Sequence, residues 1–159
     1  MEGSPPALED RRAVELALRA VSARDRTVAE LRTYLERKRV EPAAIDRAVA
    51  ELTGAGLLDD ERYARRFTED KQELQRWGLE RIARELQKRG IPPELVENAL
   101  ASTARSDELA AATSLLRERY GPLRDDSERD RAWRLLVRRG YEPELAYEAV
   151  RELGRSAPA

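Results

Sequence analysis

Apolar residues recur along this 159-residue chain at intervals of three and four positions, the spacing that places side chains on one face of an α-helix. The pattern also repeats at long range, because residues 31–52, 82–103 and 132–153 align without gaps at offsets of 51 and then 50 residues. Three columns of this alignment keep one residue type throughout: Leu35, Leu86 and Leu136; Pro42, Pro93 and Pro143; and Ala48, Ala99 and Ala149. A fixed period of this size is typical of a repeat architecture.

Each aligned segment predicts two helices. The first helix of each pair ends in a basic turn, and Gly90 and Gly140 then occupy the position where a left-handed residue commonly follows a helix. The first segment has Arg39 or Val40 there, so we expect a less regular end. The second helix begins at the aligned proline, which is tolerated in a first helical turn because the missing N–H has no partner there.

A further helix is predicted ahead of each pair, at about residues 13–23, 60–75 and 107–120. Asp59 is expected to cap the second of these helices and Ser106 the third. No stretch alternates with period two, so no strand is predicted. The fold class is therefore all-α, with three tandem three-helix repeats (nine helices) in an elongated curved array. The expected boundaries are a flexible tail at 1–10, repeats at 11–58, 59–105 and 106–154, and a second tail at 155–159.

Composition narrows the chemistry. The chain has no cysteine and no histidine, which excludes disulfides, thiol nucleophiles, zinc sites with Cys or His ligands, and histidine acid–base catalysis. No glycine-rich phosphate loop and no metal-ligand spacing is present, so we expect a protein that is not an enzyme and needs no cofactor or metal. No signal peptide and no apolar run of about 18 residues is visible, which predicts a cytoplasmic protein without a membrane partner.

The net charge is -1, so any binding of an acidic partner depends on how the charges are distributed. Basic residues concentrate on the middle helix of each repeat, where they could form a stripe facing phosphates or acidic protein surface. They could equally interact only with the carbonyl groups at a helix end. The candidate contacts are Arg37, Lys38, Arg39, Arg66, Arg81, Arg84, Lys88, Arg89, Arg131, Arg134 and Arg138.

Three other features have alternative interpretations. Trp133 aligns with Arg32 and Ala83, which indicates either an apolar contact surface in the third repeat or a terminal repeat that buries the indole. Residues 59–61, all acidic, are explained better by capping of a helix start than by a metal site. Tyr63 and Phe67 lie four positions apart and are expected to pack in the core.

Residues 56–67, with the sequence GLLDDERYARRF, resemble the signature that joins the first two three-helix units of the RecX family. Residues 29–35 (AELRTYL) resemble the first repeat of that family, and residues 84–91 (RELQKRGI) resemble the second. The resemblance covers roughly residues 13 to 154. It implies a non-enzymatic modulator that binds the RecA recombinase filament on single-stranded DNA and limits its growth, ATP hydrolysis and strand exchange, and with them the SOS response.

Two other functions stay open at this point. A helical-repeat adaptor for another protein would have a similar pattern of helices. Weak binding of single-stranded or double-stranded DNA is a further property that the resemblance implies, although the sequence pI of about 5.8 places it in doubt. The chain is expected to be a monomer.

Overall fold

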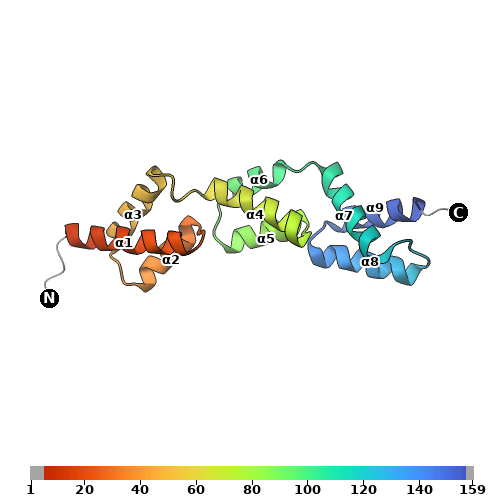
Figure 1. Cartoon of the computed structure of the whole chain (residues 1–159), viewed down its shortest axis with the longest axis horizontal. Helices are drawn as coiled ribbons and strands as arrows, with labels where there is room; N and C mark the ends of the chain where they lie inside the picture. Colours follow the sequence, from red (N-terminus) through yellow and green to blue (C-terminus); the bar gives the residue numbers. More distant parts are fainter. Residues whose placement is uncertain (1–5, 157–159) are drawn as a thin grey trace. The chain divides into compact units, whose positions relative to one another are not determined.

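The computed structural model describes residues 6–156, and those residues form helices and no strand (Figure 1). The predicted all-α fold is therefore confirmed. Over this part of the chain the elements are α1 (Pro6–Ala23), α2 (Val28–Arg37), α3 (Pro42–Gly54), α4 (Asp60–Gln75), α5 (Leu79–Lys88), α6 (Pro93–Ala101), α7 (Arg105–Tyr120), α8 (Asp126–Arg139) and α9 (Pro143–Arg155). The three aligned prolines each begin a helix, as predicted.

The expected N-terminal tail at 1–10 is wrong for residues 6–10, which form the first turns of α1. Asp10 explains the difference, because its Oδ1 atom lies 2.7 Å from Nη2 of Arg47 on α3 and fixes this end of the helix. At the other end α9 extends to Arg155, so that residue is helical and not part of a tail. Residues 1–5 and 157–159 lie outside the described part of the chain.

The expected caps have different outcomes. The Asp59 carboxylate accepts the N–H of Arg62 at 3.0 Å, which confirms it as a cap of α4. Ser106 does not cap α7, because that helix begins one residue earlier, at Arg105, after an Ala104 that makes no side-chain cap bond. The capping prediction failed because Ser106 already has helical geometry.

The chain divides into two compact units. Unit 1 comprises Met1–Ala64 with Leu86–Leu95, and unit 2 comprises Arg65–Glu85 with Val96–Ala159. This division passes through the second predicted repeat. The boundaries at 58/59 and 105/106 are therefore not those of the compact units, and they stay a prediction.

The core of unit 1 lies between α1, α2 and α3, which pack against one another (Figure 1). The side of α1 that faces this core carries Ala13, Ala17 and Ala20, and these small side chains let the helix approach closely. Leu31 and Leu35 of α2 are completely buried against it. Truncating either leucine to alanine would cost about 2–5 kcal/mol in the free energy of unfolding.

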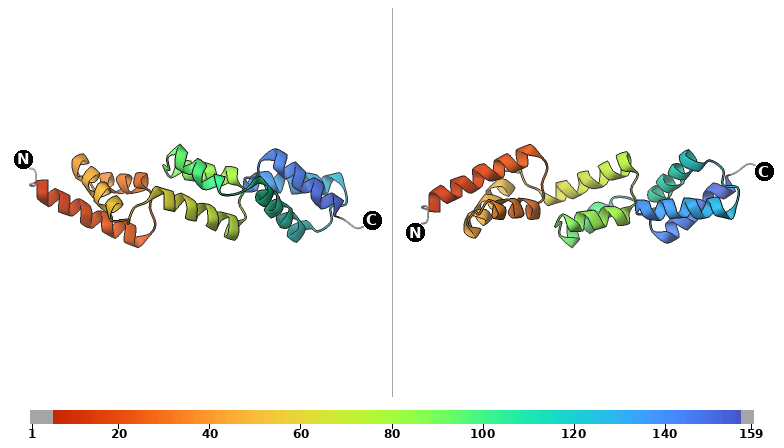
Figure 2. Two further views of the ribbon diagram at one scale, coloured as in Figure 1. Left: turned by 90° about the horizontal axis from the view of Figure 1, so that it is seen from above. Right: turned by 90° about the horizontal axis from the view of Figure 1, so that it is seen from below.

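The core of unit 2 lies between α7, α8 and α9, the teal to blue helices of Figure 2. Leu116 of α7, Leu136 of α8 and Leu145 of α9 are buried at its centre. Trp133 and Val137 pack against this core and are only partly buried. The apolar residues that the third repeat has at these two positions thus contribute to the core of unit 2.

A contact between the ends of two helices ties unit 1 together. The Thr27 hydroxyl, at the start of α2, donates to the carbonyl of Arg89, at the end of α5, over 2.6 Å. Thr27 is fully buried and also forms a reciprocal capping box with Glu30. The Asp60 carboxylate accepts the N–H of Val28 at 2.9 Å, and burial raises the pKa of Asp60. The start of α2 therefore has tertiary as well as local partners.

Unit 2 contains the same kind of contact. The N–H groups of Gly78 and Glu80, at the start of α5, donate to the carbonyls of Arg139 and Gly140, at the end of α8, over 2.8 and 3.1 Å. The Glu108 carboxylate accepts the N–H of Leu79 at 3.0 Å, and burial raises its pKa. In both units a carboxylate from a later helix thus completes the N-terminus of a middle helix.

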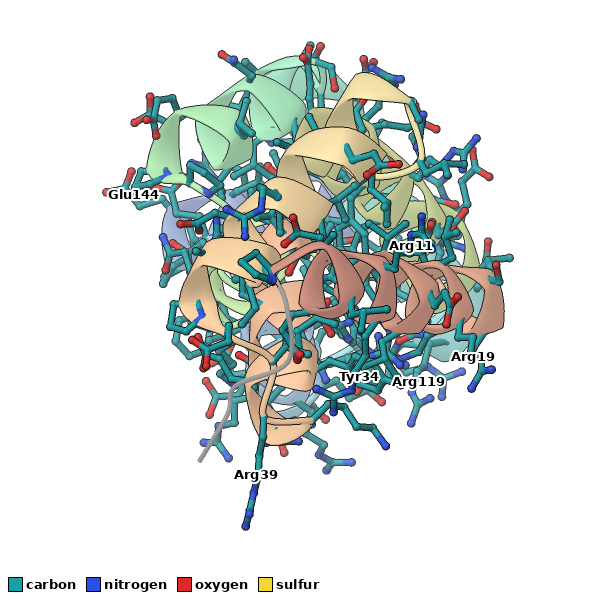
Figure 3. The ribbon with its side chains drawn as sticks, turned by 90° about the vertical axis from the view of Figure 1, so that its left-hand side faces the viewer. Arg11, Arg19, Tyr34, Arg39, Arg119 and Glu144 are labelled. Carbon is teal, nitrogen blue, oxygen red and sulfur yellow. The ribbon has the colours of Figure 1, made fainter. Side chains whose placement is uncertain are left out.

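In the first repeat, the carbonyl at the end of the middle helix is bonded by a side chain of the same repeat. Lys38 aligns with Arg89 and Arg139, and its carbonyl accepts a hydrogen bond from the Arg12 side chain of α1 at 2.7 Å. The next residue, Arg39, has a φ of 58°, where Gly90 and Gly140 stand in the other repeats. Glycine is needed at those two positions because a Cβ atom would overlap Ala29 and Arg81, respectively, whereas the Arg39 side chain extends away from the ribbon (Figure 3).

Replacing Gly140 by alanine should strongly destabilise the protein. The residue has a φ of +94° and an added Cβ would overlap Arg81, so we expect a loss of about 2–4 kcal/mol in the free energy of unfolding. Gly56→Ala is the matched control, because its φ is +73° and nothing lies within 4 Å of the added atom. Urea denaturation should give a loss of only about 1 kcal/mol for the control. Equal losses would show that the contact with Arg81 contributes nothing.

Because Tyr141 is buried, we expect the protein to lose stability at alkaline pH. Its hydroxyl donates to the Arg76 carbonyl at 3.2 Å, and burial raises the pKa of Tyr141 to about 12. Because the folded pKa lies above the ordinary value, the contribution is complete below about pH 10 and is lost as pH rises toward 12. We expect the free energy of unfolding to fall by about 2–3 kcal/mol over this range. Tyr141→Phe should remove that part of the pH dependence, and an unchanged slope in the variant would contradict the assignment.

Candidate partner-binding surface

A groove in unit 1 brings together cationic side chains from the connection between α1 and α2, from α2 itself, and from the end of α5, which is distant in sequence. We call it the α2 groove; its volume is about 300 Å³ and it is lined by Arg24, Arg26, Ala29, Glu30, Thr33, Tyr34, Arg37, Lys88, Arg89 and Gly90. Five of these residues are basic and one is acidic. The end-to-end contact between α5 and α2 creates the groove, because it places Lys88 and Arg89 beside the exposed side of α2.

The single carboxylate of the α2 groove is already engaged. Glu30 accepts from the Thr27 backbone N–H at 3.2 Å and from the Arg24 guanidinium at 3.1 Å. Exposed Arg37 makes no ion pair within residues 6–156. The groove therefore has a surplus of positive charge that an anionic group could neutralise.

Tyr34 provides an aromatic surface among these cations. The Arg26 guanidinium lies 5.0 Å from the centre of its ring, and the Lys38 ammonium lies 5.6 Å from it. Cations at this distance are attracted to the electron-rich face of the ring. Arg26 also donates from Nε to the Ala20 carbonyl at 2.9 Å, which fixes its position. This side of α2 is thus partly ordered before any partner binds.

Arg89 has a structural role as well as a place in the groove. Its guanidinium donates to the Tyr63 hydroxyl at 2.8 Å, and both residues are largely withdrawn from solvent. Burial raises the pKa of Tyr63, and the neighbouring Arg89 charge opposes that rise. For Arg89, this bond supports the alternative that a basic residue at the end of a helix has a structural role.

The remaining predicted contacts do not gather in the α2 groove. Arg39 lines a separate pocket that also contains Glu9 and Glu41. Arg66 and Arg84 are exposed. The Arg81 guanidinium lies 3.9 Å from the centre of the Trp77 ring, so it packs on an aromatic side chain of its own unit.

The predicted contacts on α8 are exposed but differ in their bonding. Arg134 makes an ion pair with Asp130 at 2.7 Å, and Arg131 donates to the Ser127 hydroxyl at 3.2 Å. Arg138 is exposed near the end of the helix. These side chains follow one helix and do not surround a cavity as those of the α2 groove do.

A second groove lies between α8 and α9 in unit 2. We call it the α8/α9 groove; its volume is about 790 Å³ and it is lined by Asp126, Arg129, Asp130, Trp133, Tyr147, Val150, Arg151, Gly154 and Arg155. Trp133 forms part of its wall, and the indole N–H donates to the Pro143 carbonyl at 3.1 Å. Tyr147 keeps 58% of its surface exposed, with the Arg151 guanidinium 5.7 Å from the centre of its ring.

Sequence reasoning found Trp133 but missed Tyr147 and Arg151. The signal for Tyr147 was present, because its column contains Asp46 and Glu97 in the other repeats. An aromatic residue in an otherwise acidic column indicates an exposed ring. Arg151 has no comparable signal, since its proximity to Tyr147 depends on the side-chain conformations of α9.

Two further features bear on the kinds of site present. No group of three or more potential metal-ligating side chains lies together within residues 6–156. None of the helices described is long and apolar enough to cross a bilayer.

Comparison with known proteins identifies the relatives of the chain. Residues 13–52 match the family described as RecX, first three-helix domain, and residues 59–100 match RecX, second three-helix domain. The protein named Regulatory protein RecX from Trichlorobacter lovleyi is 37% identical over 134 residues, which cover 81% of this chain and 87% of the relative. The protein of the same name from Mycolicibacterium smegmatis is 31% identical over 156 residues, which cover 94% of this chain and 83% of the relative.

Solved structures share the fold. The crystal structure of RecX from Lactobacillus salivarius matches with a TM-score of 0.83 at 21% identity, covering 92% of this chain and 97% of that one. A second crystal structure, of a regulatory protein RecX, matches with a TM-score of 0.76 at 19% identity, covering 91% and 72%. The matched domains, the sequence identities and the fold agree with the resemblance of residues 56–67, and the chain belongs to the RecX family of regulatory proteins.

Proposed function

We propose that this protein binds RecA filaments on single-stranded DNA and restrains their growth, ATP hydrolysis and strand exchange, so regulating DNA repair, recombination and the SOS response. It acts as a non-enzymatic cytoplasmic modulator and needs no cofactor. Membership of the RecX family supports this role, because its members carry the name of a regulatory protein.

The surplus of positive charge in the α2 groove carries the proposal. Arg24, Arg26 and Arg37 line the groove together with Tyr34, and Glu30, the one acidic residue among the lining residues, is already bonded. An acidic surface of RecA would neutralise these charges, while the net charge of -1 keeps the protein as a whole from attracting polyanions strongly. The groove therefore favours binding to a RecA surface over general binding to free DNA.

Arg37 is the side chain best suited to test this binding mode. It is exposed, lines the α2 groove and makes no ion pair within residues 6–156, so its replacement should leave the fold intact. We expect the wild-type protein to inhibit ATP hydrolysis by the cognate RecA on single-stranded DNA when present well below one molecule per RecA. Arg37→Glu should raise the concentration needed for half inhibition by about tenfold or more, because it reverses a charge at the interface.

Arg131→Glu is the matched control, because this arginine is also exposed on a middle helix but lies outside both grooves. It should inhibit almost as well as the wild type. Equal weakening by both variants would indicate a general charge effect and reject the α2 groove as the contact. No inhibition by equimolar wild-type protein at moderate salt would reject the proposed function itself and favour an adaptor role.

Fluorescence anisotropy with labelled single-stranded DNA, in the absence of RecA, tests the alternative that the protein binds free DNA. We expect weak binding that decreases steeply with salt, since phosphate contacts release counterions. Tight binding to free DNA that Arg37→Glu abolishes would instead place the nucleic acid itself in the α2 groove.

A further inference from the structure

An exposed leucine projects from α4 beside two acidic side chains that make no ion pair with any residue in the described range 6–156. Leu74 is 79% exposed, which is unusual for a large apolar side chain on a helix that contributes to a compact unit. Asp70 lies one turn before it and Glu73 immediately before it, and both are exposed. Neither carboxylate makes an ion pair within the described residues. We call Asp70, Glu73 and Leu74 the α4 knob.

The α8/α9 groove has the complementary composition. Its apolar wall comes from Trp133, Tyr147 and Val150. Its own carboxylates are neutralised, because Asp126 pairs with Arg129 at 2.9 Å and Asp130 pairs with Arg134 at 2.7 Å.

Two further arginines line the groove and differ from Arg129 in their ion pairing. Arg151 and Arg155 are exposed, and within residues 6–156 neither makes an ion pair. In the part of the chain that the structure describes, two arginines without an ion pair beside an apolar wall thus match two carboxylates without an ion pair beside a leucine.

The knob does not reach the far end of the groove in its own molecule. The end of α4 lies at the carboxyl end of α8, because the Arg139 guanidinium donates to the Gln75 carbonyl at 2.6 Å. Asp126 and Arg155 mark the far end of the groove, at the opposite end of α8. The rise of an α-helix places Asp126 and Arg139 about 20 Å apart.

We propose that the α8/α9 groove binds the α4 knob of a second copy of this chain. Leu74 enters the apolar part of the groove, and Asp70 and Glu73 face Arg151 and Arg155. The two surfaces differ, so the contact is head-to-tail, and a dimer leaves one knob and one groove free. A contact built on one leucine and two ion pairs is small, so we expect a dissociation constant of about 0.1–1 mM in free solution.

Sedimentation of the purified protein, without RecA or DNA, tests this contact directly. The weight-average mass of the wild type should rise with concentration up to about 1 mM and should fall when salt is added, because the ion pairs are exposed. The knob variant Asp70→Lys/Glu73→Lys and the groove variant Arg151→Glu/Arg155→Glu should each stay monomeric. All four side chains are exposed, so circular dichroism should show unchanged folding.

Combination of the variants gives the decisive result. The knob variant retains an intact groove and the groove variant retains an intact knob, so the two variants should associate with each other when they are mixed in equimolar amounts. The altered knob and the altered groove carry exchanged charges and also attract each other, so the mixture should recover the concentration-dependent rise in mass that each variant lacks alone. One chain with all four substitutions exchanges the charges and should associate again to within about threefold of the wild type.

Three outcomes would overturn the proposal. They are a wild type that stays monomeric at about 1 mM, variants that associate as the wild type does, and a mixture of the two variants that forms no dimer. Glu61→Lys, another exposed acidic position on α4, is the control and should associate normally. Because RecA is absent from these experiments, their result is independent of the proposed function.

Discussion

The contact between the end of one middle helix and the start of another is the interaction on which the molecule depends most. Helix ends leave carbonyl and N–H groups without partners, and burial of such groups is costly unless they are bonded. Here the carbonyls of Arg89 and Arg139 each receive a donor from the start of another middle helix, while Asp60 and Glu108 accept from the N–H groups beside those donors. The two carboxylates lie in environments that raise their pKa by burial, so the bonds are kept at some cost in desolvation.

The same contact assembles the functional surface. Lys88 lies about fifty positions from Arg37 in sequence, and the two meet in the α2 groove only because α5 ends where α2 begins. The bonds that hold the helix ends also fix Arg89, whose guanidinium turns toward Tyr63. The stability of unit 1 and the arrangement of its cations are therefore coupled, and a change at Thr27 would disturb both.

The helices and their start positions could be predicted from the sequence because they depend on local patterns. Aligned prolines begin α3, α6 and α9, and Gly90 and Gly140 have the positive φ that their place after a helix indicates. The bonding of individual arginines could not be predicted, because it depends on side chains that meet in space. Arg81 packs on Trp77 and Arg89 bonds Tyr63, whereas Arg37 in the same kind of position remains exposed. Ser106 shows a related difficulty, since a helix that begins one residue earlier turns a capping residue into an internal one.

The closed end of the first repeat has a consequence for how such chains can grow in evolution. Arg12 occupies the Lys38 carbonyl, and Arg39 has a side chain where a glycine would be needed to receive another helix. A duplicated gene segment placed ahead of the first repeat would thus meet an end that cannot accept it. A segment inserted further along would meet glycine at each helix end. Lengthening by duplication is therefore directed to positions after the first repeat.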